Sequence, residues 1–285
     1  MHFAILAIVL SAGLLAQTAP KQGSVPQGQP QQQGSPGQQN TAPAQESRPP
    51  PGPAGEASPS AASWQQSFDE LWKQRDSQGA TAQLHRILEP QLAADKRSFE
   101  ANWRLAALYN WEANQVEGDP RADLGHKAWD AAEIAVATHP KDVRAQYNEA
   151  VGIGLYAEGT GILKALSQGL EGKFRDHIGA ALKADKDYLD GAPQVVWGRF
   201  FFKLPWPKRD DNQSIAILAP LMDSHPHNLR AKLYLADSVA DEGSVDDGRK
   251  LVQQILDAPP GDDPPETRFL QKEGRKWMAA HAGAK

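Results

Sequence analysis

From Ser63 onward, apolar residues recur at intervals of three and four, the spacing that places side chains on one face of an α-helix. Trp64, Phe68, Leu71 and Trp72 form the first of these apolar stripes. Further stripes of this kind occur over residues 84–92, 103–111, 128–135, 197–204 and 215–222. The pattern predicts an all-α fold for residues 63–285.

Residues 191–226 predict two helices that are separated by a sharp break. Pro205 and Pro207 end the first helix and hold Trp206 on a stiff, extended bend, because proline fixes its own φ angle and restricts the residue before it. A helix pair of this kind cannot bury its apolar faces alone, so it needs similar pairs stacked on either side. The rest of the folded part supplies such pairs.

The ends of the predicted second helices repeat along the chain. Small residues at helical spacing precede Pro140, and a similar frame returns before Pro226 and Pro260. The last two prolines are 34 residues apart, which is the length of a tetratricopeptide (TPR) repeat. We therefore expect a right-handed α–α superhelix, a TPR-like solenoid of four or five helix pairs, over residues 63–285.

Residues 264–281 predict one further helix, with Phe269, Leu270 and Trp277 facing inward and basic residues facing outward. A solenoid needs such a polar-backed helix at its end, because the last repeat would otherwise expose its apolar face. We expect this helix to act as a cap.

Residues 148–173 are unusually rich in glycine, although a glycine costs about 1 kcal/mol inside a helix. Close packing of helix on helix, or a long and mobile hairpin, explains this composition best. A lipophilic lid is the alternative, because Ile162, Leu163, Leu166 and Leu170 lie in the same segment. A phosphate-binding loop is disfavoured, since the segment has no G-x-x-x-x-G-K-[ST] pattern.

The N-terminal part has the composition of an export signal and a linker. Residues 3–16 form an uncharged apolar run that is too short for a bilayer span of about 20 residues, and we interpret residues 1–17 as a signal peptide. Residues 18–62 are rich in Pro, Gln and Gly, which predicts a disordered linker. We expect an exported protein, periplasmic or associated with a bacterial envelope, with no transmembrane helix in the mature chain.

The charge and cysteine content exclude several classes of function. The chain has 285 residues, a formal net charge of -5 and no cysteine. An acidic balance argues against a nucleic-acid partner, which usually requires a basic surface. Without cysteine there are no disulfides, no thiolate catalysis, no cysteine zinc sites and no lipid anchored on cysteine.

Candidates for catalysis or metal binding are few. His225 and His227 resemble a two-histidine metal clip, but they flank Pro226 in a predicted turn, and a catalytic zinc needs three protein ligands. The aspartate pairs at 210–211, 246–247 and 262–263 lie where predicted helices begin, and negative charge is favourable there. No G-x-S-x-G nucleophile motif is present. We predict a non-enzymatic protein with no metal and no cofactor.

Three segments resemble a known family: GIGLYAEGTGILKALSQGLEGKF, DKDYLDGAPQVVWGRFFFKLPWPKRD and SIAILAPLMDSHPHNLRAKLYLADSVADEG. Through them, residues 147–256 are similar to the T-component of TRAP transporters, a family of periplasmic TPR proteins. The resemblance implies a scaffold that associates with a solute-binding protein. It also implies internal channels suited to a hydrophobic ligand, so a carrier of a hydrophobic small molecule is the alternative function. The lipoprotein cysteine of many relatives is missing here.

The concave side of a TPR solenoid is lined by the first helix of each pair, and the predicted register gives the residues of this groove. Arginines among aromatic residues suit an acidic peptide or a carboxylate. The alternative is that each arginine pairs with a nearby Asp or Glu on an exposed face and contributes little. The predicted groove residues are Arg104, Trp111, Arg144, Tyr147, Arg199, Phe202, Arg230, Leu233 and Asp237.

The bend between the prolines is a second predicted contact point. Its residues are Lys203, Trp206, Lys208 and Arg209. For Trp206 itself we favour a structural role, in which the indole plugs the bend, over recognition of a partner.

Overall fold

The computed structural model describes residues 63–283, and within this range it contains helices and no strand. The predicted all-α superhelix of stacked helix pairs is confirmed for these residues. The predicted signal peptide (1–17) and linker (18–62) lie outside the described residues.

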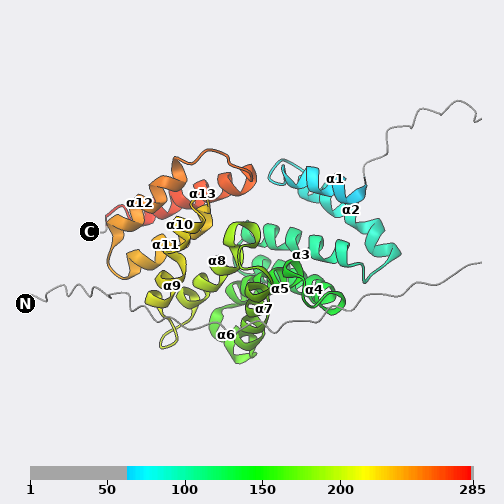
Figure 1. Cartoon of the computed structure of the whole chain (residues 1–285), viewed down its shortest axis with the longest axis horizontal. Coiled ribbons are helices and arrows are strands. Elements are labelled where there is room, and N and C mark those ends of the chain that lie inside the picture. Colours follow the sequence, from blue (N-terminus) through cyan, green and yellow to red (C-terminus); the bar gives the residue numbers. More distant parts are fainter. Residues whose placement is uncertain (1–62, 284–285) are drawn as a thin grey trace, which may run out of the picture. The chain divides into compact units, whose positions relative to one another are not determined.

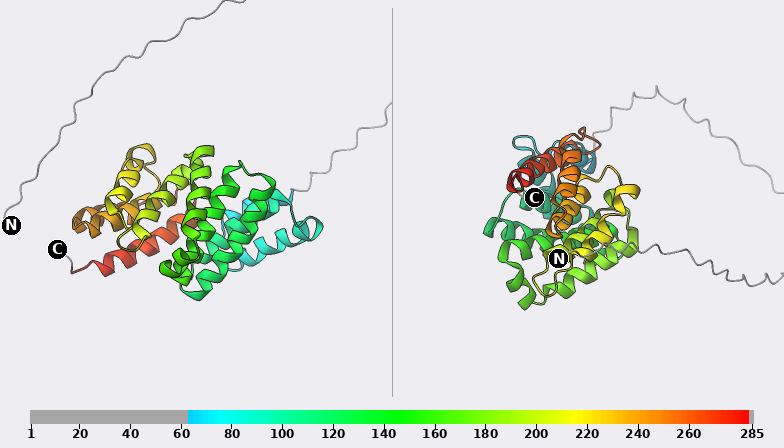
Figure 2. Two further views of the ribbon diagram at one scale, coloured as in Figure 1. Left: turned by 90° about the horizontal axis from the view of Figure 1, so that it is seen from below. Right: turned by 90° about the vertical axis from the view of Figure 1, so that its left-hand side faces the viewer.

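Thirteen helices follow one another within residues 63–283, and successive helices pack side by side (Figures 1 and 2). The predicted break at the two prolines separates α8 from α9, and short connections join most other helices. The helices are α1 (Trp64–Trp72), α2 (Ala80–Ala94), α3 (Phe99–Asn114), α4 (Asp119–Thr138), α5 (Val143–Thr160), α6 (Ile162–Ser167), α7 (Leu170–Asp185), α8 (Tyr188–Lys203), α9 (Asp211–Leu218), α10 (Leu221–Ser224), α11 (Leu229–Asp241), α12 (Val245–Leu256) and α13 (Pro264–Ala280).

Polar side chains at the helix starts explain where several helices begin. Ser63 and Gln66 form a capping box at α1, in which each side chain accepts a hydrogen bond from the other residue's backbone N–H. Asp210 and Asp263 accept from the backbone N–H three residues on, at 2.8 and 3.1 Å. Together with the aspartates in the first turn of α12, they confirm that the paired aspartates serve the helix starts.

Two glycines of α5 allow this helix to touch α4 backbone to backbone. A Cβ atom on Gly159 would lie 2.4 Å from the Ala122 backbone N, and one on Gly152 would lie 2.7 Å from the Trp129 backbone N. Neither distance is compatible with a side chain, so only glycine permits this approach. Close helix packing, the favoured explanation of the glycine-rich segment, is confirmed at these two positions.

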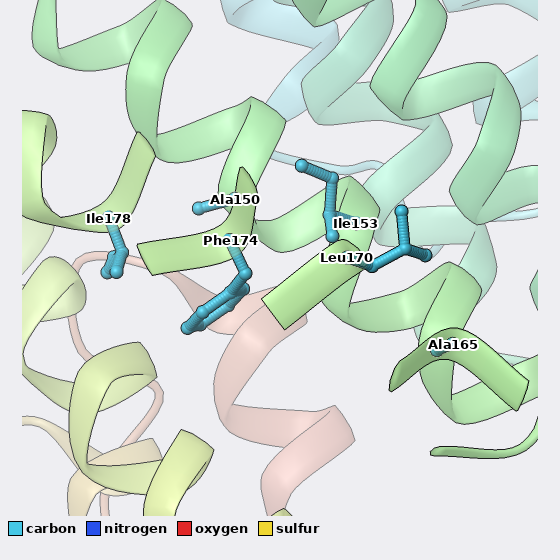
Figure 3. Packing of buried hydrophobic residues seen from close by; sticks show 6 residues of the cluster. All are labelled: Ala150, Ile153, Ala165, Leu170, Phe174 and Ile178. Atoms are coloured by element: carbon cyan, nitrogen blue, oxygen red, sulfur yellow. The ribbon is translucent and has the colours of Figure 1, made fainter. Parts of the chain in front are cut away.

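A cluster of buried apolar residues joins α5, α6 and α7 (Figure 3). Phe174 of α7 packs in this cluster with Ala150 and Ile153 of α5 and with Ala165 of α6, and all four are at most 6% exposed. The cluster fixes the short helix α6 against the end of α5. Glycines with positive φ, at positions 161 (94°) and 169 (74°), form the turns on either side of α6.

The last helix, α13, is more than a cap. Its start lies beside the turn that follows α1 (Figure 1). There Arg75 lies 2.7 Å from Asp263, and Arg268 donates two hydrogen bonds to Asp76 at 2.5 and 2.8 Å. We call these four residues the α1–α13 clasp. No sequence pattern indicates this clasp, because it joins residues that are 188 and 192 positions apart through the curvature of the whole stack.

Among residues 63–283, no helix combines the length and the apolar character needed to cross a membrane.

Candidate functional site

The inner side of the helix stack borders a half-open cavity of about 1480 Å³. Ordinary small-molecule sites measure roughly 300–1,000 Å³, so this space can hold a ligand larger than a typical metabolite. Its walls come mainly from the first helices of the pairs, α3, α5, α8 and α11, and from α1 and the segment leading into α13. We call it the inner cavity.

One end of the inner cavity is apolar. Its walls include Ile162 and Leu166 of α6, Leu170 and Phe174 of α7, and Phe200 of α8. Phe174 and Phe200 stack with ring centroids 4.7 Å apart. α6 therefore forms part of the cavity wall. The lipophilic character predicted for this segment thus has a structural role, in addition to the close packing at its glycines.

A third glycine of α5 faces this space. Gly154 lines the inner cavity, and a Cβ atom there would meet only Phe174 Cε2, at an ordinary contact distance of 3.7 Å. The position therefore has room for a side chain, and any side chain built there would reduce the cavity.

The opposite end of the inner cavity is polar. The rings of Tyr147 (α5) and Tyr188 (α8) meet edge to face, 5.7 Å apart. Arg230 (α11) binds Glu266 of α13 at 2.6 Å and donates a hydrogen bond to the Tyr234 hydroxyl at 3.1 Å. We call these five residues the polar end.

Burial sets the protonation state of the groups at the polar end. It raises the pKa of Tyr188 to about 12 and raises the pKa of Tyr147 further, so both phenols stay neutral at physiological pH. Burial alone would lower the pKa of Arg230, but Glu266 and Tyr234 outweigh it and raise this pKa above its ordinary value. The polar end therefore presents neutral phenols beside a paired guanidinium.

A strained turn holds Tyr188 in place. The next two residues, Leu189 and Asp190, have left-handed φ angles of 47° and 58°, which cost about 1–2 kcal/mol each for residues other than glycine. His225 binds the Asp190 carboxylate at 2.9 Å, and Asn228 donates to the Asp190 carbonyl at 2.6 Å. His225, considered above as half of a metal clip, is thus a structural residue of this turn.

The structure holds no cluster of three or more His, Asp or Glu able to bind a metal within residues 63–283.

Each arginine of the predicted groove set has a carboxylate partner. Arg199 binds Asp237 at 2.6 Å, and Arg104 binds Asp69 and Glu100 at 3.1 and 2.5 Å. Arg144 binds Asp142 at 2.8 Å, and Arg230 has its Glu266 partner. The alternative to an acidic ligand, in which each arginine pairs with a nearby Asp or Glu, is therefore present. These ion pairs lie in partly buried positions rather than on an exposed face.

The structure brings together only part of the predicted groove set. Trp111, Tyr147, Arg199 and Arg230 line the inner cavity. A neighbouring cavity of about 420 Å³ is lined by Leu233 and Asp237, together with Arg199 and Arg230. The remaining members, Arg104, Arg144 and Phe202, line neither cavity.

The prediction that Trp206 plugs the bend was wrong, because its side chain is 89% exposed. The bend is held instead by its cations. Lys203 and Lys208 bind Glu158 and Glu171 at 3.4 and 2.5 Å. Arg209 binds Asp211 and Asp241 and lies 4.2 Å from the ring of Phe202. These contacts position the bend without the indole.

Sequence reasoning missed Tyr188, Phe174 and the clasp residue Arg75. Arg75 is 4% exposed and lies between the rings of Trp72 and Trp111, 4.6 and 4.3 Å from their centroids. A signal existed only for Tyr188, which stands in the quoted DKDYLDGAP segment. Arg75 and Phe174 acquire their positions through contacts between distant helices.

A solved structure supports the fold. The chain is similar to a thermophilic TPR protein of Thermus thermophilus, with a TM-score of 0.54, 14% sequence identity, and coverage of 74% of this chain and 99% of that one. At this identity the likeness shows the TPR-like fold alone. No curated protein matches the sequence.

The family comparison does not confirm the resemblance to the TRAP T-component. A family model described as "Regulator of microtubule dynamics protein 1-3" matches residues 64–209, which include α1 to α8 and most of the walls of the inner cavity. Because this match spans half of the sequence, the chain belongs to the family of regulator of microtubule dynamics proteins 1-3.

Proposed function

We propose that this TPR-like protein is a non-catalytic binding protein whose inner cavity takes up an elongated ligand with a long apolar part. The observation that carries the proposal is the cavity of about 1480 Å³ with its apolar wall from α6, α7 and α8. A space of this size and lining is the default ligand site of a protein.

The arrangement of α5 suits an extended ligand. Tyr147 at the polar end and Glu158 beyond the apolar end both line the inner cavity. A helix rises 1.5 Å per residue, so these side chains lie roughly 16 Å apart along α5. Val151 and Gly154 lie between them on the same face. An apolar chain that binds along this face would exchange contact with water for contact with apolar walls. This burial contributes about 25 cal/mol to the free energy of binding for each Å² of apolar surface.

The test uses a variant that fills the space. Gly154→Leu places an isobutyl group in the inner cavity, whereas Gly179→Leu adds the same group on α7, where nothing lies within 4 Å of an added Cβ. We expect the wild-type protein and Gly179→Leu to bind Nile red and monopalmitoylglycerol, and Gly154→Leu to lose both. Native mass spectrometry and Nile red fluorescence measure the binding. Equal binding by all three proteins, or none by the wild type, contradicts the proposal.

A partner protein is the second candidate, and the exposure of Trp206 favours it. An indole that is 89% exposed beside Lys208 on a well-anchored bend is a typical protein-contact residue. The partner expected from the sequence is a solute-binding component of a TRAP transporter, met after export of the chain. The name of the family suggests microtubules as a second bait.

A pull-down with each bait distinguishes these partners, with Trp206→Ala as the test and Trp129→Ala, which affects the α4–α5 side, as the control for general damage. We expect Trp206→Ala alone to abolish capture while its unfolding midpoint is unchanged. Undiminished capture by Trp206→Ala removes the bend from the interface.

A further inference from the structure

The two phenols at the polar end have free hydrogen-bonding capacity. Within residues 63–283, neither the Tyr147 nor the Tyr188 hydroxyl has a hydrogen-bond partner, although both side chains line the inner cavity. Both side chains are only partly buried, so their hydroxyls remain open to the space of the cavity. Two such donors side by side can bind one acceptor atom of a ligand that enters this space.

The phenols are hydrogen-bond donors rather than anions. The burial that raises their pKa values keeps the proton on each oxygen across the physiological range. A ligand atom that satisfies both of them must accept hydrogen bonds, as a carbonyl or ester oxygen does.

The two arginines beside the phenols are already paired with carboxylates, and Lys232, a third cation of the cavity wall, donates to the Pro226 carbonyl. Arg230 already binds Glu266, and Arg144, the cation with the largest charge effect on Tyr188, already binds Asp142 through two hydrogen bonds of 3.0 and 2.8 Å. A carboxylate or phosphate that binds here would lose its hydration. It would lie near the carboxylates of Glu266 and Asp142, whose arginine partners are already paired. An uncharged head group has no such cost.

The wall of the inner cavity also contains a hydrogen-bond acceptor, the side-chain oxygen of Asn110. Asn110 is 6% exposed and lines the inner cavity; its Nδ2 donates to Asn148 at 3.1 Å, while its Oδ1 is buried without a partner among the described residues. A ligand that also carries a hydroxyl could satisfy an acceptor on this wall.

We propose that the polar end recognises an uncharged head group with ester and hydroxyl oxygens, so that the preferred ligand class is neutral acyl esters such as monoacylglycerols rather than fatty acids or other anions. Tyr147 and Tyr188 donate to the ester oxygen, and the acyl chain follows α5 to the apolar end. This inference rests on the proposed function, because it specifies the head group of the ligand of the same cavity.

The experiment compares head groups on acyl or alkyl chains of one length. Monopalmitoylglycerol, palmitic acid and hexadecylamine compete with Nile red for the full chain at about pH 8, where the acid is ionised and the amine is charged. We expect the glyceride to compete at least about tenfold more strongly than either charged compound, since each lost hydrogen bond or unpaired charge weakens binding by about that factor.

Conservative variants identify the residues. Tyr147→Phe and Tyr188→Phe remove only the hydroxyl, and each should weaken glyceride binding about three- to tenfold while leaving Nile red binding unchanged. Tyr156→Phe is the matched control, because Tyr156 packs against Trp129 and His126 and does not line the inner cavity. It should bind all probes like the wild type.

The outcomes separate this inference from the proposed function. Stronger competition by palmitic acid, equal competition by the three head groups, or full glyceride affinity in both Tyr→Phe variants overturns the head-group assignment while the cavity still binds apolar chains. Failure of every probe, Nile red included, overturns the proposed function itself.

Discussion

The two faces of α5 carry the same residue type for opposite reasons. On the face toward α4, Gly152 and Gly159 allow backbone contact, and an added Cβ would lie within 2.7 Å of a backbone nitrogen. On the inner face, Gly154 borders the cavity, and an added Cβ would make one ordinary contact at 3.7 Å. A glycine in a helix can thus mark a position where a neighbouring backbone leaves no room for a side chain. It can also mark a position where the missing side chain leaves a cavity open.

The difference shows how one helix can serve stability and binding together. The face toward α4, which we call the tight face, fixes α5 against its partner helix. The inner face therefore does not have to pack against other helices for α5 to be held in place. The inner cavity persists because its walls are positioned by contacts on their other sides.

The largest effect is expected on the tight face. Gly159→Ala forces α4 and α5 apart, because the new methyl group would lie 2.4 Å from the Ala122 backbone N. We expect the free energy of unfolding to fall by about 3 kcal/mol, at the upper end of overpacking costs. Urea denaturation measures it. Gly172→Ala, in open space on α7, should not destabilise the protein, and a neutral Gly159→Ala would contradict the close approach.

The next effect concerns the α1–α13 clasp, which joins the turn after α1 to the start of α13. Arg75→Ala removes the ion pair with Asp263 and the contacts with two indole rings. We expect a loss of about 2 kcal/mol, since hydrogen bonds to charged groups contribute about 1.5–3 kcal/mol. Arg268→Ala breaks the more exposed pair of the clasp and should cost less than about 1 kcal/mol. Equal effects on thermal unfolding would show that burial of Arg75 has no special role.

A smaller effect of opposite sign is expected on the inner face. Gly154→Ala should stabilise the protein by about 0.5–1 kcal/mol, because alanine is the better helix former and its methyl group has room. Measured beside Gly159→Ala under the same conditions, it gives the contrast between the two faces of α5 directly. A loss of stability at position 154 would show that the cavity does not exist in solution.

The smallest effect concerns an ion-pair network that joins Glu100 in the first turn of α3 to the start of α5. Burial alone would raise the pKa of Glu100, but hydrogen bonds from Arg104 and Trp103 and the charge of Arg144 outweigh it and lower this pKa. A carboxylate with a lowered pKa stabilises the fold above its unfolded pKa of about 4.3 and loses that contribution as the pH falls through the folded value.

Glu100→Gln should therefore be less stable than the wild type at neutral pH, by less than about 1 kcal/mol because the pair is partly exposed. The difference should shrink as the pH falls below about 4. Urea midpoints across this range measure it, with the exposed Glu70→Gln as a control that should stay close to the wild type throughout. A stability difference between Glu100→Gln and the wild type that grows as the pH falls would contradict the lowered pKa of Glu100.

Much of the fold could be predicted because it depends on local patterns. The apolar stripes predicted α1 to α4, the prolines predicted the break after α8, and Asp210 marked the start of α9. These features are encoded within one or two helical turns, so the sequence displays them directly.

The site was less accessible to this reasoning. The pattern placed Tyr147 and Arg230 on the inner side, but it also included Arg104 and Arg144, which line neither cavity. It assigned Trp206 to the interior of the bend, although ion pairs of the neighbouring cations hold the bend without it. Whether a side chain reaches a cavity depends on its neighbours from other helices, which periodicity does not specify.

The sequence by itself determined that residues 63–283 form paired helices with one apolar face each, because helix formation and its ends are set by residues three and four apart. Only the tertiary structure decided that the stack closes on itself through Arg75 and Asp263, and that the space left inside has one apolar and one polar end. Small angles between successive helices accumulate along the stack, and no local pattern records their sum.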